Sequence, residues 1–393
     1  MRIDRYIHDV ILADLHEPTM VFLAGPRQVG KTTLAHILGE KDFTAYQYLN
    51  WDDSDDQKRI LARDFEADAR LLVFDELHKY RNWKNYLKGL YDKQKTRFAI
   101  IATGSARLDM YRRGGDSLMG RYHHLRLHPF SLAELVGQRF SSSPFSELMF
   151  PVETSTIAQA ARDLLRFGGF PKPFLQKSDT ALRRFHNERF DRLIKEDIRD
   201  TERVHDLSLL QELAALLPER ASCRLSLNNL REDLGVAHKT VSHWMDVFER
   251  FYYHFRITPF AIKTAASLRK EPKLYLWDWS VVEDAGNRFE NMIASHLLKF
   301  VHFLCDTQGY KAMVHYMRDR DGREVDFLIT INQKPWFAVE VKYSDTTISP
   351  HLSYYMQRAR IPFGYQVVAT PGIHRIRDSI HVISASRFLA GLV

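Results

Sequence analysis

Gly25-Pro26-Arg27-Gln28-Val29-Gly30-Lys31-Thr32-Thr33 is the stretch that decides the fold of the first part of this chain. It matches the pattern G-x-x-x-x-G-K-[ST], which is typical of a loop that binds phosphate groups. The apolar residues 20–24 before it predict a buried strand, and residues 33–38 after it have the apolar spacing of a helix. A loop between strand and helix points its N–H groups and the helix N-terminus at an anion. The alternative is a glycine turn that contains a lysine by coincidence.

The loop predicts binding of a nucleotide together with a metal ion. We expect all nine quoted residues to lie against the nucleotide, with Lys31 reaching its β- and γ-phosphates. The hydroxyl group of Thr32 would complete the shell of a Mg²⁺ ion. ATP and Mg²⁺ are therefore the expected cofactors.

A second apolar run, residues 71–74, ends in Asp75-Glu76 about 45 residues after the loop. In a parallel α/β sheet the carboxyl ends of the strands open onto the ligand crevice, so these acids would emerge beside the loop. We predict that Asp75 holds Mg²⁺ and that Glu76 orients and polarises the attacking water. The acidic run at residues 52–56 is instead expected to cap a helix and face water.

Two further residues of this part have candidate roles. Thr103-Gly104-Ser105 follows the apolar run 98–102, and Ser105 could sense the γ-phosphate or serve as a turn and helix cap. Arg121 follows Gly120 and could stabilise phosphate in a neighbouring subunit's site, or lie on the surface.

Composition sets broad limits on the class of protein. A chain of 393 residues should hold two or three domains, and 45% hydrophobic residues suffice for packed cores. A net charge of +7 admits a nucleic-acid partner and equally a solvated basic surface. The two cysteines lie far apart, and we find no signal sequence or membrane-span pattern. We therefore expect a cytoplasmic protein without a membrane partner.

The motifs of this chain follow an order that resembles the order found in a known family. It includes the loop, Phe74-Asp75-Glu76, Thr103-Gly104-Ser105, Gly120-Arg121, Pro129-Phe-Ser-Leu-Ala-Glu134 and Gly168-Gly169-Phe-Pro171. The set resembles the bacterial and archaeal AAA-type ATPases that carry an additional C-terminal domain. The resemblance implies a core AAA fold and a homo-oligomeric ring. It also implies that Ser105 is the sensor residue and that Arg121 of the Gly-Arg pair contacts phosphate.

The middle of the chain is predicted to be helical. Residues 141–205 are expected to form a lid or connector, and residues 206–262 a winged helix-turn-helix. The latter rests on a helix at 227–234, a glycine turn, a helix at 238–252 and a strand at 252–257. Lys239, Ser242 and His243 near the start of the second helix would meet DNA. The alternative is a winged helix that docks onto a protein.

Residues 263–393 carry a second set of charged residues. Strands at 314–317 and 325–331 are joined across an Asp-Gly turn, and Asp326 takes the face opposite to its apolar neighbours. Glu340 and Lys342 share a face of the strand at 336–342. This arrangement resembles the PD-(D/E)xK nuclease superfamily, although that motif's proline is missing before Asp326. The resemblance implies metal binding by Asp326, Glu340 and Glu290, with Lys342 assisting the attacking water. A structural Glu340–Lys342 ion pair is the alternative.

These observations predict an α/β protein with an AAA-type P-loop domain at 1–140 and a nuclease-like domain at 263–393. The predicted function is ATP binding and Mg²⁺-dependent hydrolysis directed at DNA, in repair, recombination or mobile-element defence, with possible endonuclease activity. The alternative is a nucleotide-switched regulatory or scaffold protein whose C-terminal part binds a protein partner.

Overall fold

The computed structural model describes residues 3–104, 118–199, 206–260 and 271–393. The chain forms two compact units, residues 1–128 and residues 129–393. The three segments that the sequence analysis placed after residue 140 all lie in the second unit.

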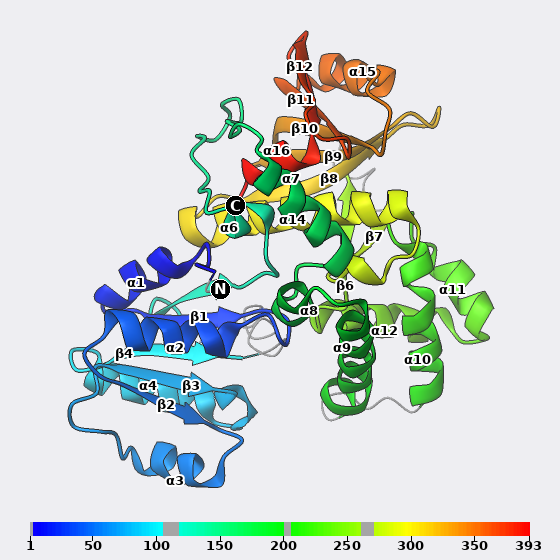
Figure 1. Cartoon of the computed structure of the whole chain (residues 1–393). Coiled ribbons are helices and arrows are strands. Elements are labelled where there is room, and N and C mark those ends of the chain that lie inside the picture. The colour runs from blue at the N-terminus through cyan, green and yellow to red at the C-terminus, as the bar shows by residue number, and fades with distance from the viewer. Residues whose placement is uncertain (1–2, 105–117, 200–205, 261–270) are drawn as a thin grey trace. The chain divides into compact units, whose positions relative to one another are not determined.

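The first unit is built on a parallel sheet. Its described strands follow the order β2-β3-β4-β1-β5, with every neighbouring pair parallel (Figure 1). The strands are β1 (Met20–Ala24), β2 (Tyr46–Asn50), β3 (Leu71–Asp75), β4 (Ala99–Thr103) and β5 (Tyr122–Arg126). The helices are α1 (His8–His16), α2 (Lys31–Asp42), α3 (Ser54–Ala62), α4 (Trp83–Gln94) and the short 3₁₀-helix η1 (Leu77–Lys79). The predicted α/β fold with a parallel sheet is confirmed for this unit.

Both faces of this sheet are covered, which explains why its central strands are apolar throughout. Along β1, Phe22 joins the core formed with α4 residues such as Leu87, whereas Val21 joins the core formed with α1 and α2, where Leu34 lies. Alternate residues of a strand point to opposite faces, so a strand buried on both sides needs a continuous apolar run. The acidic run behaves as predicted: Asp53 caps α3 by accepting hydrogen bonds from two backbone N–H groups.

The second unit begins with helices. They are α6 (Leu132–Leu135), α7 (Ser155–Phe167), α8 (Pro171–Gln176), α9 (Asp179–Arg192), the π-helical segment η3 (Leu193–Ile198), α10 (Leu207–Leu216), the 3₁₀-turn η4 (Pro218–Arg220), α11 (Leu227–Leu234) and α12 (His238–Arg250). The predicted helices of the middle segment are confirmed within one to a few residues at their ends, apart from residues 193–199, where the regular α-helix has already ended. Val241, Met245 and Phe248 of α12 are buried, as the periodicity predicted.

A mixed sheet fills the rest of the second unit, with the described strands in the order β12-β13-β11-β10-β9-β8-β6-β7 (Figure 1). They are β6 (His254–Pro259), β7 (Lys273–Leu276), β8 (Ala312–Arg318), β9 (Glu324–Ile331), β10 (Lys334–Lys342), β11 (Phe363–Val368), β12 (His374–Arg377) and β13 (Ile380–Ser384). Between and after them come η5 (Trp279–Val281), α14 (Ala285–Gln308), α15 (Pro350–Ala359) and α16 (Ala385–Ala390). Because β6 pairs with both β7 and β8, the strand expected in a winged helix belongs to the same sheet as the C-terminal strands.

A buried ion pair anchors the start of the second unit. Glu134 of α6 and Lys299 of α14 are each 2% exposed, and they contact one another directly. Lys299 also donates to Ser131 Oγ at 2.9 Å, and Glu134 accepts from the backbone N–H of Ser131 at 3.0 Å. The Pro129–Glu134 motif therefore packs inside the second unit. Among the described residues, we find no helix long and apolar enough to cross a membrane.

Candidate nucleotide-binding site and C-terminal carboxylate cluster

The phosphate-binding loop lies between β1 and α2, where the sequence placed it. Gly25 has a φ of 145°, and a Cβ atom there would lie 2.4 Å from the carbonyl oxygen of Leu127, so a larger residue would clash with backbone. Gly30 has a φ of 99° and stands directly before the first residue of α2. The Nζ atom of Lys31 donates to the carbonyl oxygens of Gly25 and Pro26, each at 2.9 Å. The ammonium group is thus held over the loop at the N-terminus of α2, where phosphate binds in such loops.

Asp75 at the end of β3 is the centre of a hydrogen-bond network. Its Oδ2 atom accepts from Thr32 Oγ1 at 2.8 Å and from the hydroxyl of Tyr48 at 2.7 Å. Its Oδ1 atom accepts from Thr103 Oγ1, which the parallel register places directly across from it on β4. Burial by itself raises the pKa of Asp75, but these hydrogen bonds favour the carboxylate and lower the pKa overall. Asp75 is therefore held ionised beside the loop.

Glu76 follows in an unusual backbone conformation. Its φ of 55° lies in the left-handed region, which costs a residue with a side chain about 1–3 kcal/mol. Its Oε2 atom has no hydrogen-bond partner in the described part of the chain, although His78 Nε2 lies 3.4 Å away and Lys79 Nζ 3.7 Å away. Burial raises the pKa of Glu76. The turn thus holds a carboxylate oxygen that can accept a hydrogen bond from water.

The donor set fits Mg²⁺. This ion prefers oxygen ligands and is usually held by one or two protein side chains together with phosphate and water. The Thr32 hydroxyl and the Asp75 carboxylate lie within hydrogen-bond distance of one another, at the end of the loop that carries Lys31. These are the residues that would hold the ion.

The structure describes one of the other two residues predicted for this site, Ser105 and Arg121. Ser105 lies outside the described residues. Arg121 forms an ion pair with Asp92 of α4, with its Nε atom 2.9 Å from Oδ1. Tyr48 and His78 were missed by sequence reasoning. The sequence could have pointed to His78, because it follows Glu76 by two residues, but it contained nothing that pointed to Tyr48.

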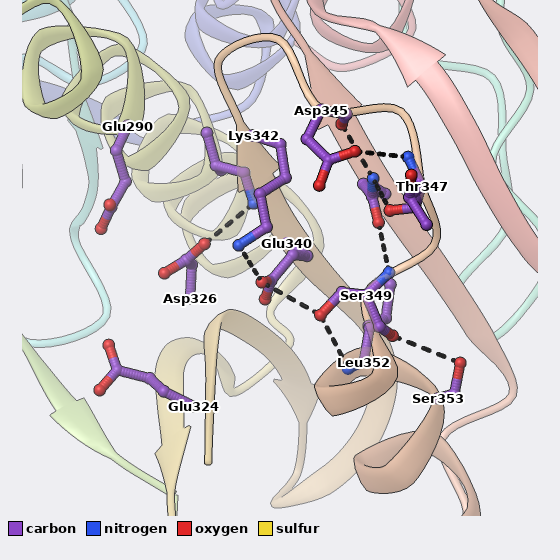
Figure 2. A network of polar contacts seen from close by, with 12 residues as sticks. Glu290, Glu324, Asp326, Glu340, Lys342, Asp345, Thr347, Ser349, Leu352 and Ser353 are labelled. Atoms are coloured by element: carbon purple, nitrogen blue, oxygen red, sulfur yellow. Dashed lines mark hydrogen bonds and ion pairs between the residues drawn. The ribbon is translucent and has the colours of Figure 1, made fainter. Parts of the chain in front are cut away.

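The C-terminal residues predicted to act together lie around the ends of β9 and β10. Figure 2 shows Asp326 on β9 facing Glu340 and Lys342 of β10, with Glu290 and Glu324 beside them. Asp326 Oδ2 accepts from the backbone N–H of Val341 at 2.9 Å, and Lys342 Nζ lies 2.8 Å from Glu340 Oε1. The ion pair that the sequence analysis weighed as the alternative is therefore present.

A lysine that the sequence analysis passed over lies among these acids. Lys273 Nζ is 3.2 Å from Glu290 Oε1, 2.7 Å from Glu324 Oε1 and 3.2 Å from Asp326 Oδ1. In the described ranges, no group of three or more His, Cys, Asp or Glu side chains is placed to hold a metal ion. This arrangement does not fit the predicted Mg²⁺ site of Glu290, Asp326 and Glu340.

The geometry of the first unit defines a P-loop nucleotide-binding domain. In comparison with known proteins, residues 17–136 match the family described as an AAA domain (AAA_14), and we identify this segment as an AAA-type ATPase domain. Residues 158–290 and 285–388 match two domains of unknown function, DUF8612 and DUF4143.

Similarity to individual proteins extends over most of the chain. An uncharacterized protein of Methanocaldococcus jannaschii is 22% identical over 344 residues, which cover 82% of this chain and 74% of that protein. An uncharacterized protein of Mycobacterium tuberculosis is 21% identical over 399 residues, which cover 95% of this chain and 82% of that protein. A solved structure of Thermotoga maritima RuvB is 18% identical, covers 64% of this chain and 88% of its own, and has a TM-score of 0.32. A TM-score this low supports no inference about this chain.

Proposed function

We propose that this protein binds and hydrolyses ATP in its first unit and that DNA directs this activity. The observation that carries the ATPase proposal is the contact of Thr32 with Asp75, beside Lys31 and the buried carboxylate oxygen of Glu76 that has no hydrogen-bond partner among the described residues. Two motifs separated by 43 positions thus meet at one site.

Each residue has a distinct task in this proposal. Lys31 leaves the loop carbonyls to contact the β- and γ-phosphates, and the N–H groups at the start of α2 hold the phosphate oxygens. When bound by Thr32 and Asp75, Mg²⁺ would neutralise the negative charge of these phosphates. Glu76 accepts a hydrogen bond from the attacking water and takes up its proton. Thr103 and Tyr48 keep the Asp75 carboxylate oriented and ionised.

The DNA-directed part of the proposal is supported by charge and exposure. The chain has a net charge of +7, and Lys239 and His243 are exposed on α12, which follows α11 and a turn at Gly235. Exposed lysine and histidine side chains on a helix that follows a short turn can donate hydrogen bonds to phosphate oxygens of DNA.

The experiment that tests this part is ATP hydrolysis measured with and without duplex DNA over a salt series. We expect DNA to raise the rate and high salt to remove the gain, because salt competes with lysine and arginine for phosphates. Lys239→Ala should reduce the gain. Lys334→Ala, which removes an exposed lysine at the far end of the β9–β10 hairpin from Asp326, is the matched control. A rate indifferent to DNA at low salt would contradict the proposal.

A second candidate function, a regulatory or scaffold protein switched by the nucleotide, is favoured by one observation. The acids of the part predicted to be nuclease-like are paired with Lys273 and Lys342. Under this candidate function the C-terminal sheet binds a partner and cleaves nothing. Incubation of DNA with the protein and Mg²⁺ or Mn²⁺ distinguishes a nuclease from this regulatory or scaffold function. Cleavage of DNA by the native protein that is lost in Asp326→Ala would establish the nuclease and exclude this second candidate.

A further inference from the structure

Lys273 has an environment that few lysines have. It is the first residue of β7, and its side chain is only 5% exposed. Its ammonium group contacts carboxylates from two separate elements, Glu290 on α14 and both Glu324 and Asp326 on β9. The hydroxyl of Tyr275 completes the cluster by donating to Glu290 Oε1 at 2.8 Å. These five residues are called the Lys273 cluster below.

The position of the ammonium group follows from the backbone. Lys273 pairs with Ile257 in the β6–β7 ladder, β6 pairs with β8, and β8 pairs with β9. The side chain therefore projects from a strand fixed in the sheet toward two residues of β9 that share one face, Glu324 and Asp326. Burial of an ammonium group without counter-charges is very costly, so the three carboxylates are what allow a lysine here.

Among the described residues, the charges that contact one another in this region are nearly balanced. Four carboxylates take part in these contacts, those of Glu290, Glu324, Asp326 and Glu340. They face three cations: Lys273, Arg318, which lies 2.7 Å from Glu324 Oε2, and Lys342, which lies 2.8 Å from Glu340 Oε1. A divalent metal ion is normally held by carboxylates whose charge nothing else neutralises. Here an ion entering between Glu290 and Asp326 would have to displace an ammonium group that three acids already hold.

We propose that Lys273 is the resident cation of this carboxylate cluster and takes the place of a divalent metal ion. Without that lysine, Glu290 and Asp326 become ligands for Mg²⁺ or Mn²⁺. The inference deepens the second candidate function: it rests on the proposed nuclease-like arrangement of the C-terminal sheet and explains how such an arrangement would serve binding without cleavage. It is independent of ATP hydrolysis in the first unit.

The first test uses the unmodified protein. The nucleotide-free full-length chain is titrated with Mn²⁺, and bound Mn²⁺ is counted by electron paramagnetic resonance in parallel with Asp326→Asn. We expect the two proteins to bind equally, because any Mn²⁺ at the phosphate-binding loop is common to both. A site present in the native protein and missing in Asp326→Asn would overturn the proposal.

The second test removes the lysine. Lys273→Met should gain one Mn²⁺ site that both the native protein and the double variant Lys273→Met/Asp326→Asn lack. Lys334→Met, at an exposed lysine, is the control and should gain nothing. A Lys273→Met protein with native circular dichroism and no added site would refute the proposal. If it fails to fold, the first test still decides.

Failure of this inference can be told apart from failure of the proposed ATPase. ATP hydrolysis should persist in Lys273→Met, because the lysine is not part of the P-loop site. Absence of ATPase activity from the native protein would contradict the proposed function, whatever the Mn²⁺ titrations show.

Discussion

Replacing Glu76 by glutamine is the sharpest test of the proposed ATPase site. Glutamine has nearly the same shape, so it preserves the backbone turn at φ 55° while removing the negative charge that accepts a proton. Asp75 keeps its hydrogen bonds from Thr32, Tyr48 and Thr103, because these bonds do not involve the Glu76 side chain. We therefore expect ATP binding to be retained or strengthened, since a carboxylate near the phosphates is lost.

The expected magnitude follows from the role of a general base. A positioned base contributes about 10²- to 10⁴-fold to a rate, which corresponds to about 2.7–5.4 kcal/mol of activation free energy. The buried Oε2 atom of Glu76 has no hydrogen-bond partner within the described residues, so it is free to accept one from the attacking water. The turnover number should fall accordingly, while the affinity for ATP should not.

The pH dependence offers a second readout. Burial raises the pKa of Glu76 above its ordinary value, and only the deprotonated form can act as a base. The rate should thus fall as the pH drops through the raised pKa, at a higher pH than an ordinary glutamate would give. This acid limb should disappear in Glu76→Gln.

The assay is phosphate release at saturating ATP, together with titration of a fluorescent ATP analogue. Glu40→Gln, at an exposed glutamate of α2, is the matched control and should be unchanged in both measurements. A turnover number for Glu76→Gln within about twofold of the native value would refute the assignment of Glu76 as the base.

Three further predictions test the surroundings of the site and the fold. Lys31→Ala should abolish ATP binding in the analogue titration, because the loop loses the cation that contacts the phosphates; retained binding would contradict the P-loop assignment. Tyr48→Phe should raise the Mg²⁺ concentration for half-maximal hydrolysis about tenfold, because Asp75 loses a donor at 2.7 Å; an unchanged Mg²⁺ dependence would remove Tyr48 from the site. Lys299→Met should lower the free energy of unfolding of the second unit, measured by urea denaturation, by about 3–5 kcal/mol, because it leaves the buried Glu134 carboxylate without its cation. Adding Glu134→Gln should recover part of this loss.

The N-terminal site was predictable because its signals are local. A glycine-rich loop between an apolar strand and a helix, and a second apolar strand that ends in two acids, each follow from a few adjacent residues. The rule that parallel strands end at one edge of the sheet then brings Thr32 and Asp75 together. Tyr48 could not be found this way, because a tyrosine on a half-buried strand is ordinary in sequence.

The amino-acid sequence by itself determined the α/β class of the first unit and the residues that define its P-loop site, since both depend on patterns a few residues long. Tertiary structure alone decided that β6 joins the C-terminal sheet and that Lys273 lies 3.2 Å from Asp326, 53 positions further along the chain. The physical reason is that the charge balance of a buried cluster depends on which distant side chains the sheet brings together. No local pattern around Glu290, Glu324 or Asp326 indicates that a lysine from another strand already pairs with these carboxylates.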